Sequence, residues 1–259
     1  MDERTKRATL RRYFTSLYPV WAILGIVSSL VFALLAILPL SYGYPNVALT
    51  VVSLSAIGLL VVLFFGASAQ KAAQAAADAR LDAWLEEDLQ KLSKTSLTKL
   101  ATEGSDLVSD PVQITGPRLW DTGGATVLFR KGQDNRLRFT PVSVSIIHFT
   151  QNQLLAYECV FDSTTGRPLN ERTEEYFYKD VVAVSTKSES RTVKSAALGT
   201  LQLTAAETFT LTTAGGTSLS VVLSDPSLIA KMGGGEIPTS RAEKAVLAVR
   251  KMLRDKKTN

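Results

Sequence analysis

Two apolar stretches decide how this chain is organised: VWAILGIVSSLVFALLAILPL at residues 20–40 and VALTVVSLSAIGLLVVLFFG at residues 47–66. The short segment SYGYPN (41–46) separates them, and no Asp, Glu, Lys, Arg or His occurs between Tyr13 and Gln70. A helix needs roughly 20 mainly apolar residues to cross the hydrocarbon core of a bilayer. Both stretches meet that length, so the sequence predicts a transmembrane hairpin over residues 18–66, with the lipid bilayer as a partner.

A signal peptide and a pair of soluble helices both fit this region less well. A cleaved signal peptide has a single short apolar core, whereas here a second apolar run follows at once. A buried pair of soluble helices usually keeps a polar face, which neither stretch has. Basic residues near the ends of spans stay on the cytoplasmic side, and they flank both stretches here: Arg4, Lys6, Arg7, Arg11 and Arg12 before, Lys71 and Arg80 after. We therefore expect an inner-membrane protein with both termini in the cytoplasm.

Composition limits the remaining functions. The 259 residues carry a net charge of +5, and much of it lies in the basic cytoplasmic arm, residues 1–17, which we expect to contact anionic lipid. Outside this arm we find no basic face with aromatic or helical readout elements, so we do not expect nucleic-acid binding. The single cysteine, Cys159, permits no internal disulfide, in keeping with a reducing cytoplasm.

A helical stalk is predicted over residues 67–101, because strong helix formers fill it and no Pro or Gly interrupts it before Ala101. Its leucines recur near one face of the helix and must pack on something, either the chain's own domain or another copy: Leu81, Leu85, Leu89, Leu92 and Leu100. Small alanines at helical spacing also permit close contact between helices, so a homo-oligomer is a further expectation.

The polypeptide after the stalk reads as a linker over residues 102–124, followed by a β-rich domain over 125–259. Gly and Pro mark the linker, in which Val112–Thr115 is the one strand-like run. From residue 125, short strands with alternating side chains and intervening turns predict an antiparallel β-barrel or sandwich. A basic amphipathic helix over 241–256 should end the chain, packing its apolar stripe on the barrel or lying on the bilayer. The predicted fold class is therefore α+β.

We find no pattern that supports catalysis, a cofactor or a metal. His148 and Cys159 are the only histidine and cysteine, which is too few for a zinc site. A thiol–imidazole pair of these two is the one nucleophilic arrangement available, and a buried structural role for each is favoured. The acidic patch around Tyr176 reads as a solvated strand face, and the glycines at 233–235 lack the Lys of a phosphate loop. We expect a protein that is not an enzyme.

Two segments resemble a known family. The runs IHFTQNQLLAY (147–157) and EEYFYKDVVAV (174–184), followed by the terminal helix, resemble bacterial pleckstrin-homology-like (PH-like) domains attached to membrane hairpins. The resemblance covers residues 125–257 and implies a small barrel capped by a helix. It transfers no catalytic residue, and the basic loop residues of lipid-binding relatives have no match here.

Basic residues near an early hairpin and on the terminal helix are the candidates for contact with an anionic surface: Arg130, Lys131, Arg136, Arg138, Arg250, Lys251 and Arg254. The favoured function is a membrane-anchored interaction or scaffolding module that binds a cytoplasmic protein partner, the membrane surface or other copies of itself. The alternative is a ligand-sensing membrane effector, in which the barrel binds a small anionic molecule and signals to the hairpin. A pocket lined by convergent basic and aromatic side chains would favour the alternative.

Overall fold

A computed structural model describes residues 2–15, 27, 31, 45–195, 197–216, 218–224, 226–236 and 240–257. The chain forms two compact units, one of Met1–Phe14 with Leu81–Asn259 and the other of Thr15–Arg80. The first predicted span, residues 20–40, lies outside the described residues except for Val27 and Val31.

One long helix, α3 (Pro45–Lys99), contains the second apolar stretch and the predicted stalk. The helix continues from the second apolar stretch into the predicted stalk without a break and ends at Lys99, two residues before the predicted end at residue 101. Within the described part of the chain, no helix combines the length and the hydropathy that a membrane span requires.

The basic arm, for which the sequence predicted no helix, folds as α1 (Glu3–Thr15). Lys6, Leu10 and Tyr13 are its buried residues. Their spacing of four and three places all three on one face of a helix. The arm is therefore an amphipathic helix with a lysine inside its apolar face.

Four antiparallel strands form the larger sheet, in the order β1-β4-β5-β6: β1 (Val112–Pro117), β4 (Val142–Phe149), β5 (Gln153–Asp162) and β6 (Arg167–Phe177). β1 is the strand-like run that the sequence placed within a linker, and it pairs with β4 along its whole length. The ordered β-domain therefore begins at Val112, and we use that name for Val112–Lys257.

A second sheet holds three antiparallel strands in the order β7-β8-β9: β7 (Val181–Ser195), β8 (Gly199–Thr213) and β9 (Ser218–Ser224). A separate hairpin pairs β2 (Leu128–Lys131) with β3 (Leu137–Thr140). The remaining elements are short helices and the terminal helix: η1 (Gly104–Asp106), η2 (Tyr178–Asp180), α4 (Pro226–Lys231) and α5 (Ser240–Lys257).

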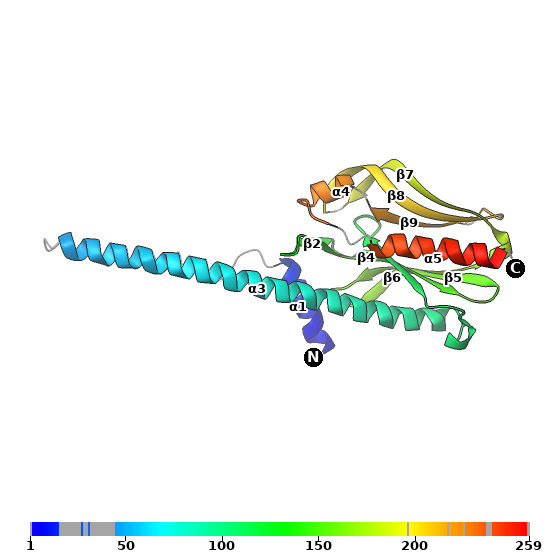
Figure 1. Cartoon of the computed structure of the whole chain (residues 1–259), viewed down its shortest axis with the longest axis horizontal. Helices are drawn as coiled ribbons and strands as arrows, with labels where there is room; N and C mark the ends of the chain where they lie inside the picture. The colour runs from blue at the N-terminus through cyan, green and yellow to red at the C-terminus, as the bar shows by residue number, and fades with distance from the viewer. Residues whose placement is uncertain are drawn as a thin grey trace. The chain divides into compact units, whose positions relative to one another are not determined.

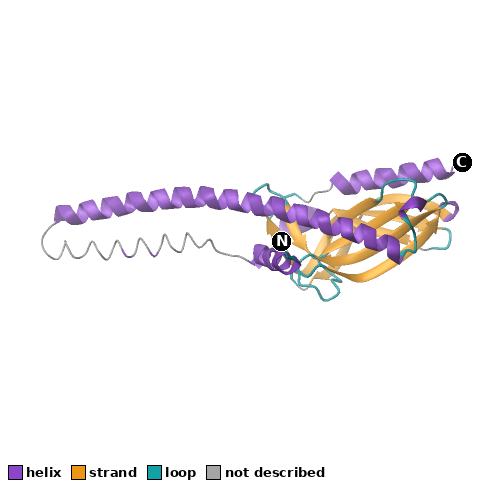
Figure 2. Cartoon of the chain, turned by 90° about the horizontal axis from the view of Figure 1, so that it is seen from below, coloured by secondary structure: helices purple, strands orange, loops and turns teal. Residues whose placement is uncertain are grey.

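The prediction of a barrel is wrong, because the described strands form separate sheets that do not close. In a barrel every strand has two neighbours, whereas β6 and β7 each have one described neighbour. The two strands follow each other in the chain, but the helical turn η2 lies between them. The coarser prediction, an α+β fold with antiparallel sheets and a C-terminal helix, is confirmed (Figure 2).

The two faces of β4 belong to two cores. Val144 and Ile146 pack in a cluster with Leu89 and Leu92 of α3. On the other face, Ile147 and Phe149 pack in a cluster that includes side chains of β7, β8 and α5. The leucine stripe therefore packs on the chain's own sheet, which decides between the two partners that the sequence left open.

The terminal helix α5 packs its apolar stripe into the second of these cores through Val246, Val249 and Leu253. It lies against β1 and η2, beside the sheet formed by β7, β8 and β9 (Figure 1). Of the two placements that the sequence left open, the structure shows the packed one. The polar side of α5 stays on the surface of the β-domain.

Candidate functional site: the β7–α5 groove

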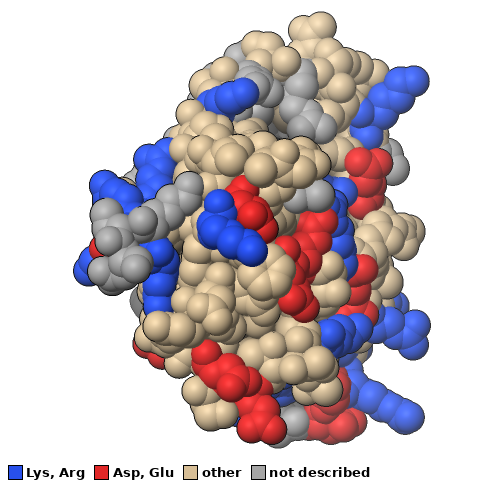
Figure 3. All heavy atoms as spheres, turned by 90° about the vertical axis from the view of Figure 1, so that its right-hand side faces the viewer, with Lys and Arg blue, Asp and Glu red and all other residues tan. Residues whose placement is uncertain are grey.

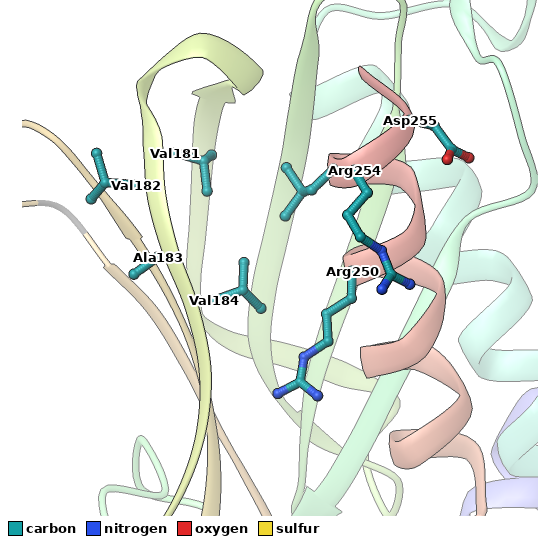
Figure 4. A pocket seen from close by; sticks show the side chains of 8 residues that line it. Val181, Val182, Ala183, Val184, Arg250, Arg254 and Asp255 are labelled. Atoms are coloured by element: carbon teal, nitrogen blue, oxygen red, sulfur yellow. The ribbon is translucent and has the colours of Figure 1, made fainter. Parts of the chain in front are cut away.

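A groove of about 470 Å³ lies between the start of β7 and the last turns of α5 (Figure 4). Its volume is within the range usual for small-molecule sites. One wall comes from β7 and the other from α5, and together they contribute Val181, Val182, Ala183, Val184, Arg250, Leu253, Arg254 and Asp255. We call it the β7–α5 groove.

The floor of the groove belongs to the core, and its rim is open to solvent. Val181 and Leu253 are 2% and 5% exposed and sit in the core cluster that α5 completes. Val182, by contrast, is 61% exposed. A register shift between Val181 and Ala183 marks a bulge at this point of the strand, and a bulge re-aims side chains locally. The bulge thus places an apolar residue at the rim.

The helical wall supplies two arginines one turn apart. Arg250 is half-buried, and its Nη2 donates a hydrogen bond of 2.7 Å to Oγ1 of Thr186 on β7. Arg254 is exposed at the rim. In Figure 4 Arg250 extends from α5 toward β7, while Asp255 points to the other side of the helix. A cation on one wall of an apolar groove can orient a ligand that carries negative charge.

The strand wall is the open edge of a sheet. Among the strands that the structure describes, β7 pairs with β8 alone. Successive side chains of a strand point to opposite faces, and yet four consecutive residues, Val181–Val184, line the groove. The groove therefore runs along the edge of β7 rather than over one face of its sheet.

Three of the predicted surface cations are bound within the protein. Nη1 of Arg130 donates to the carbonyl oxygen of Tyr13 at 2.6 Å, and the guanidinium lies 5.1 Å from the centre of the Tyr13 ring. Arg138 is 6% exposed and bonds Asp82 and Asp134. Arg136 lies 3.7 Å from the same Asp82. These three arginines hold the β2–β3 hairpin to α1 and α3.

Burial disfavours the charge of Arg138, but the two carboxylates outweigh it and raise the pKa of the guanidinium. In return, the hydrogen bond from Arg138 lowers the pKa of Asp134 to about 2. The other two predicted cations, Lys131 and Lys251, are exposed. Figure 3 shows Lys and Arg mainly along both sides of one end of the β-domain, with Asp and Glu between them.

A buried ion cluster, which the sequence did not predict, holds α1 in place. Nζ of Lys6 lies 2.8 Å from Oδ1 of Asp88, and Nη1 of Arg7 lies 2.6 Å from its Oδ2. Arg7 also donates to the carbonyl oxygen of Ser163, in the turn between β5 and β6, at 2.9 Å. Lys6 and Asp88 are 4% and 3% exposed. We call these four residues the arm junction, since they join α1, α3 and the β-domain.

His148 and Cys159, for which the sequence analysis favoured buried structural roles over a thiol–imidazole pair, lie apart in the structure. His148 faces Leu155 across β4 and β5, and Cys159 faces Val144. Four residues at about 3.3 Å each put the two side chains about 13 Å apart along the sheet. Burial raises the pKa of the Cys159 thiol to about 12, which keeps it protonated.

His148 is fully buried under α3, with its Nε2 2.7 Å from Oγ of Ser96. Oγ of Ser96 also lies 2.8 Å from the carbonyl oxygen of Ser93, and the one hydroxyl hydrogen can serve only one of these two contacts. Nδ1 has no hydrogen-bond partner among the described residues. Burial lowers the pKa of His148, which makes it a neutral structural residue.

The acidic patch of β6 divides between internal contacts and solvent. Glu171 accepts a hydrogen bond of 2.6 Å from the Tyr157 hydroxyl and pairs with Lys99 of α3 at 2.5 Å. Glu174 pairs with Arg172, while Glu175 is exposed. The described residues contain no group of three or more His, Cys, Asp or Glu that could hold a metal ion.

The groove was only partly foreseen from the sequence. Arg250 and Arg254 were candidates for anionic contact, but the four residues of β7 opposite them were read only as a strand. The one available signal was the run DVVAV (180–184), whose consecutive apolar residues depart from alternation. Comparisons of this chain with protein families, with curated proteins and with solved structures find no match.

Proposed function

We propose that this protein is a membrane-anchored, non-enzymatic interaction module whose β-domain binds an anionic partner in the β7–α5 groove. The observation that carries the proposal is the groove itself: an apolar channel at an open strand edge, with Arg250 held toward it by Thr186. A cytoplasmic protein is the partner we favour. Among the described residues that line the groove, Asp255 is the one with a carboxylate, and it points to the other side of α5.

Membrane anchoring rests on the two apolar stretches, residues 20–40 and 47–66, and on the basic residues that flank them. Exposed side chains of α3 support it. Ile57, Leu60 and Phe64 are 58%, 66% and 71% exposed, and large apolar side chains at such exposure need a cover. A bilayer would surround these apolar side chains. The basic residues on both sides of the hairpin would then keep both termini in the cytoplasm.

The resemblance to PH-like membrane proteins adds to the proposal. The β-domain has a four-stranded antiparallel sheet, a three-stranded antiparallel sheet and then a helix packed on the core. The resemblance implies a small barrel capped by a helix; α5 corresponds to the capping helix, whereas the described strands do not close into a barrel.

A photo-crosslinking experiment tests the proposal in native membranes. The full-length protein, carrying a benzophenone amino acid in place of Val182, should give covalent adducts upon irradiation. Replacing Arg250 and Arg254 by Glu should abolish them, because the reversed charges repel an anionic partner. The matched control is the same amino acid at Thr192, an exposed position farther along β7.

Two results would overturn the proposal. One is an adduct pattern from Val182 that matches the pattern from Thr192. The other is release of the full-length protein from membranes by alkaline carbonate. This treatment leaves proteins with membrane spans in the bilayer, so release would contradict the proposed membrane anchoring.

The arm junction favours a second candidate function, a ligand-sensing effector. Asp88 of α3 binds both Lys6 and Arg7 of α1, and α1 precedes the first apolar stretch while α3 contains the second. Both ends of the proposed hairpin are thus held by one carboxylate beside the β-domain. A small anion in the groove that changed the crosslinking of α1 to α3 would support this function; unchanged crosslinking at saturating anion would contradict it.

A further inference from the structure

We infer that the β7–α5 groove binds its partner as an extended acidic peptide, which adds to the free edge of β7 as a further strand and directs carboxylates at Arg250 and Arg254. This inference rests on the proposed function and deepens it, since it states the chemical class of the partner and its mode of binding.

The first argument is the strand edge. β7 runs from Val181 to Ser195, and it pairs with β8 on one side only among the described strands. An unpaired edge presents a row of N–H and C=O groups that can pair with another chain. Extended peptides bind proteins by this route, with main-chain hydrogen bonds giving affinity and side-chain pockets giving specificity.

The second argument is the shape of the groove. Val181–Val184 spans about 13 Å at 3.3 Å per residue, which is room for a short extended segment lying beside it. In such a segment alternate side chains point to opposite faces. One set would reach the apolar floor at Val181 and Leu253, and the other would point outward at the rim.

The third argument is charge. α5 is strongly basic, and Arg250 and Arg254 stand one helical turn apart on its groove side. Arg250 bonds a neutral hydroxyl, that of Thr186, which leaves its positive charge uncompensated by that bond. Guanidinium groups bind carboxylates through strong, charge-assisted hydrogen bonds. Asp255 of the same wall points to the other side of the helix, so acidic side chains complement the two arginines.

Fluorescence anisotropy on the full-length protein in detergent tests this inference. The probe is a fluorescein-labelled octapeptide of alternating Val and Glu, and the matched peptide has Lys in place of every Glu. We expect saturable binding of the acidic peptide alone. Replacing Arg250 and Arg254 by Glu should weaken it by about tenfold or more, equivalent to about 1.4 kcal/mol. Lys251→Glu, the same charge change at an exposed neighbouring position, should change it less than about twofold.

Backbone methylation gives a readout that charge alone would not produce. Two forms of the acidic peptide carry N-methyl groups on odd or on even residues. In a strand, only every second residue points its N–H toward the neighbouring strand, so one form should lose binding and the other should keep it. This measurement uses the unaltered protein and does not depend on whether any variant folds.

Equal binding of the two methylated forms, or of the Lys peptide, overturns strand addition. If the acidic peptide still binds after Arg250 and Arg254 are both replaced by Glu, these arginines do not contribute to the site. Displacement of the octapeptide by dihexanoylphosphatidylglycerol at similar concentration would assign the groove to a lipid headgroup instead. Adducts from Val182 in membranes together with equal binding of both methylated forms would leave the proposed function standing and remove only this inference.

Discussion

Arginines serve opposite purposes in two regions of this molecule. At the arm junction, Arg7 bonds both oxygens of Asp88, a carboxylate that is 3% exposed. In the β7–α5 groove, Arg250 reaches a threonine hydroxyl and lies beside an apolar channel. The first arginine is neutralised by a carboxylate within the fold, whereas the second bonds an uncharged hydroxyl and is the one that we propose binds a partner. The carboxylate on the neighbouring element makes this difference.

The β2–β3 hairpin belongs with the arm junction in this respect. Arg138 bonds Asp82 and Asp134 and is buried. The sequence analysis named Arg138 and Arg250 alike as candidates for contact with an anionic surface. A buried cation with two carboxylates holds parts of a fold together. The comparison therefore separates arginines that stabilise the protein from arginines that are available for binding, and each prediction below tests that separation.

The largest effect should come from the arm junction. Asp88→Ala leaves Lys6 and Arg7 without the buried carboxylate that compensates them, and breaking a buried ion pair from one side costs about 3 to 5 kcal/mol. Chemical denaturation of the full-length protein in detergent measures the free energy of unfolding. Glu87→Gln is the control, because Glu87 bonds the same Lys6 from an exposed position, and its loss should be much smaller. Equal losses for the two variants would show that burial of Asp88 does not matter.

Arg138→Gln should have the next largest effect, a loss of about 1 to 3 kcal/mol in the same measurement, since it removes charged hydrogen bonds from a buried position. Arg136→Gln is the matched control. Arg136 lies two residues away and also faces Asp82, but its side chain is 45% exposed, so we expect a change within about 0.5 kcal/mol. If Arg138→Gln left the free energy of unfolding unchanged, Arg138 would not be one of the arginines that stabilise the protein.

The pKa of Asp134 adds a pH dependence with a definite sign. Its folded value of about 2 is below the usual value of 3.8. The ionised carboxylate therefore stabilises the fold above about pH 4, and this contribution is lost as pH falls from about 4 toward 2. In the Arg138→Gln variant, the free energy of unfolding should change less between about pH 4 and 2 than in the unaltered protein.

A fourth test concerns His148, whose burial lowers its pKa from the usual value of 6.5. Below pH 6.5 the unfolded chain takes up a proton that the folded protein resists, so stability falls as pH falls, by at most about 1.4 kcal/mol per pH unit. Thermal denaturation at pH 7.5 and 5.5 measures the difference. His148→Gln should reduce that difference; an unchanged difference would mean that other groups cause it.

Hydrophobic pattern made much of the fold predictable. The leucine spacing in 81–100 predicted the buried face of α3, and alternating side chains predicted antiparallel strands after residue 125. In both cases the signal lies within one element, where neighbouring residues fix each other's direction. The terminal helix was predictable for the same reason, to within a residue of α5 at each end.

Pairing of charges was not predictable, because it joins residues that are far apart in the chain. Arg7 and Asp88 are 81 positions apart, and Arg138 and Asp82 are 56 apart. A glycine beside this pairing was not recognisable from the sequence either. Gly166 has a φ of +73°, and a Cβ there would lie 2.7 Å from Nε of Arg7. From the sequence alone it looked like an ordinary turn glycine, since the close approach depends on the position of α1.

Barrel closure was mispredicted for a related reason. The alternation of side chains indicates that a segment is a strand, but it does not say which strand pairs with its edge. The 15 residues of β7 were predicted only as part of a β-rich domain, and the sequence did not show that one edge of this strand is open. The candidate site therefore depends on the part of the topology about which the sequence is least informative.

The smallest effect on stability should come from the groove. Arg250→Gln and Arg254→Gln, together, should change the free energy of unfolding by less than about 1 kcal/mol, because Arg250 gives up one hydrogen bond to Thr186 and Arg254 is exposed. The same pair should nevertheless weaken binding of the acidic octapeptide. Unfolding and binding are measured on the same preparations. If the pair destabilised the protein as much as Arg138→Gln, the groove arginines would be part of the fold, and the contrast between the two regions would not hold. If the double variant is as stable as the unaltered protein but no longer binds the peptide, α5 is still packed into the core. The loss of binding is then due to the loss of the two arginine charges.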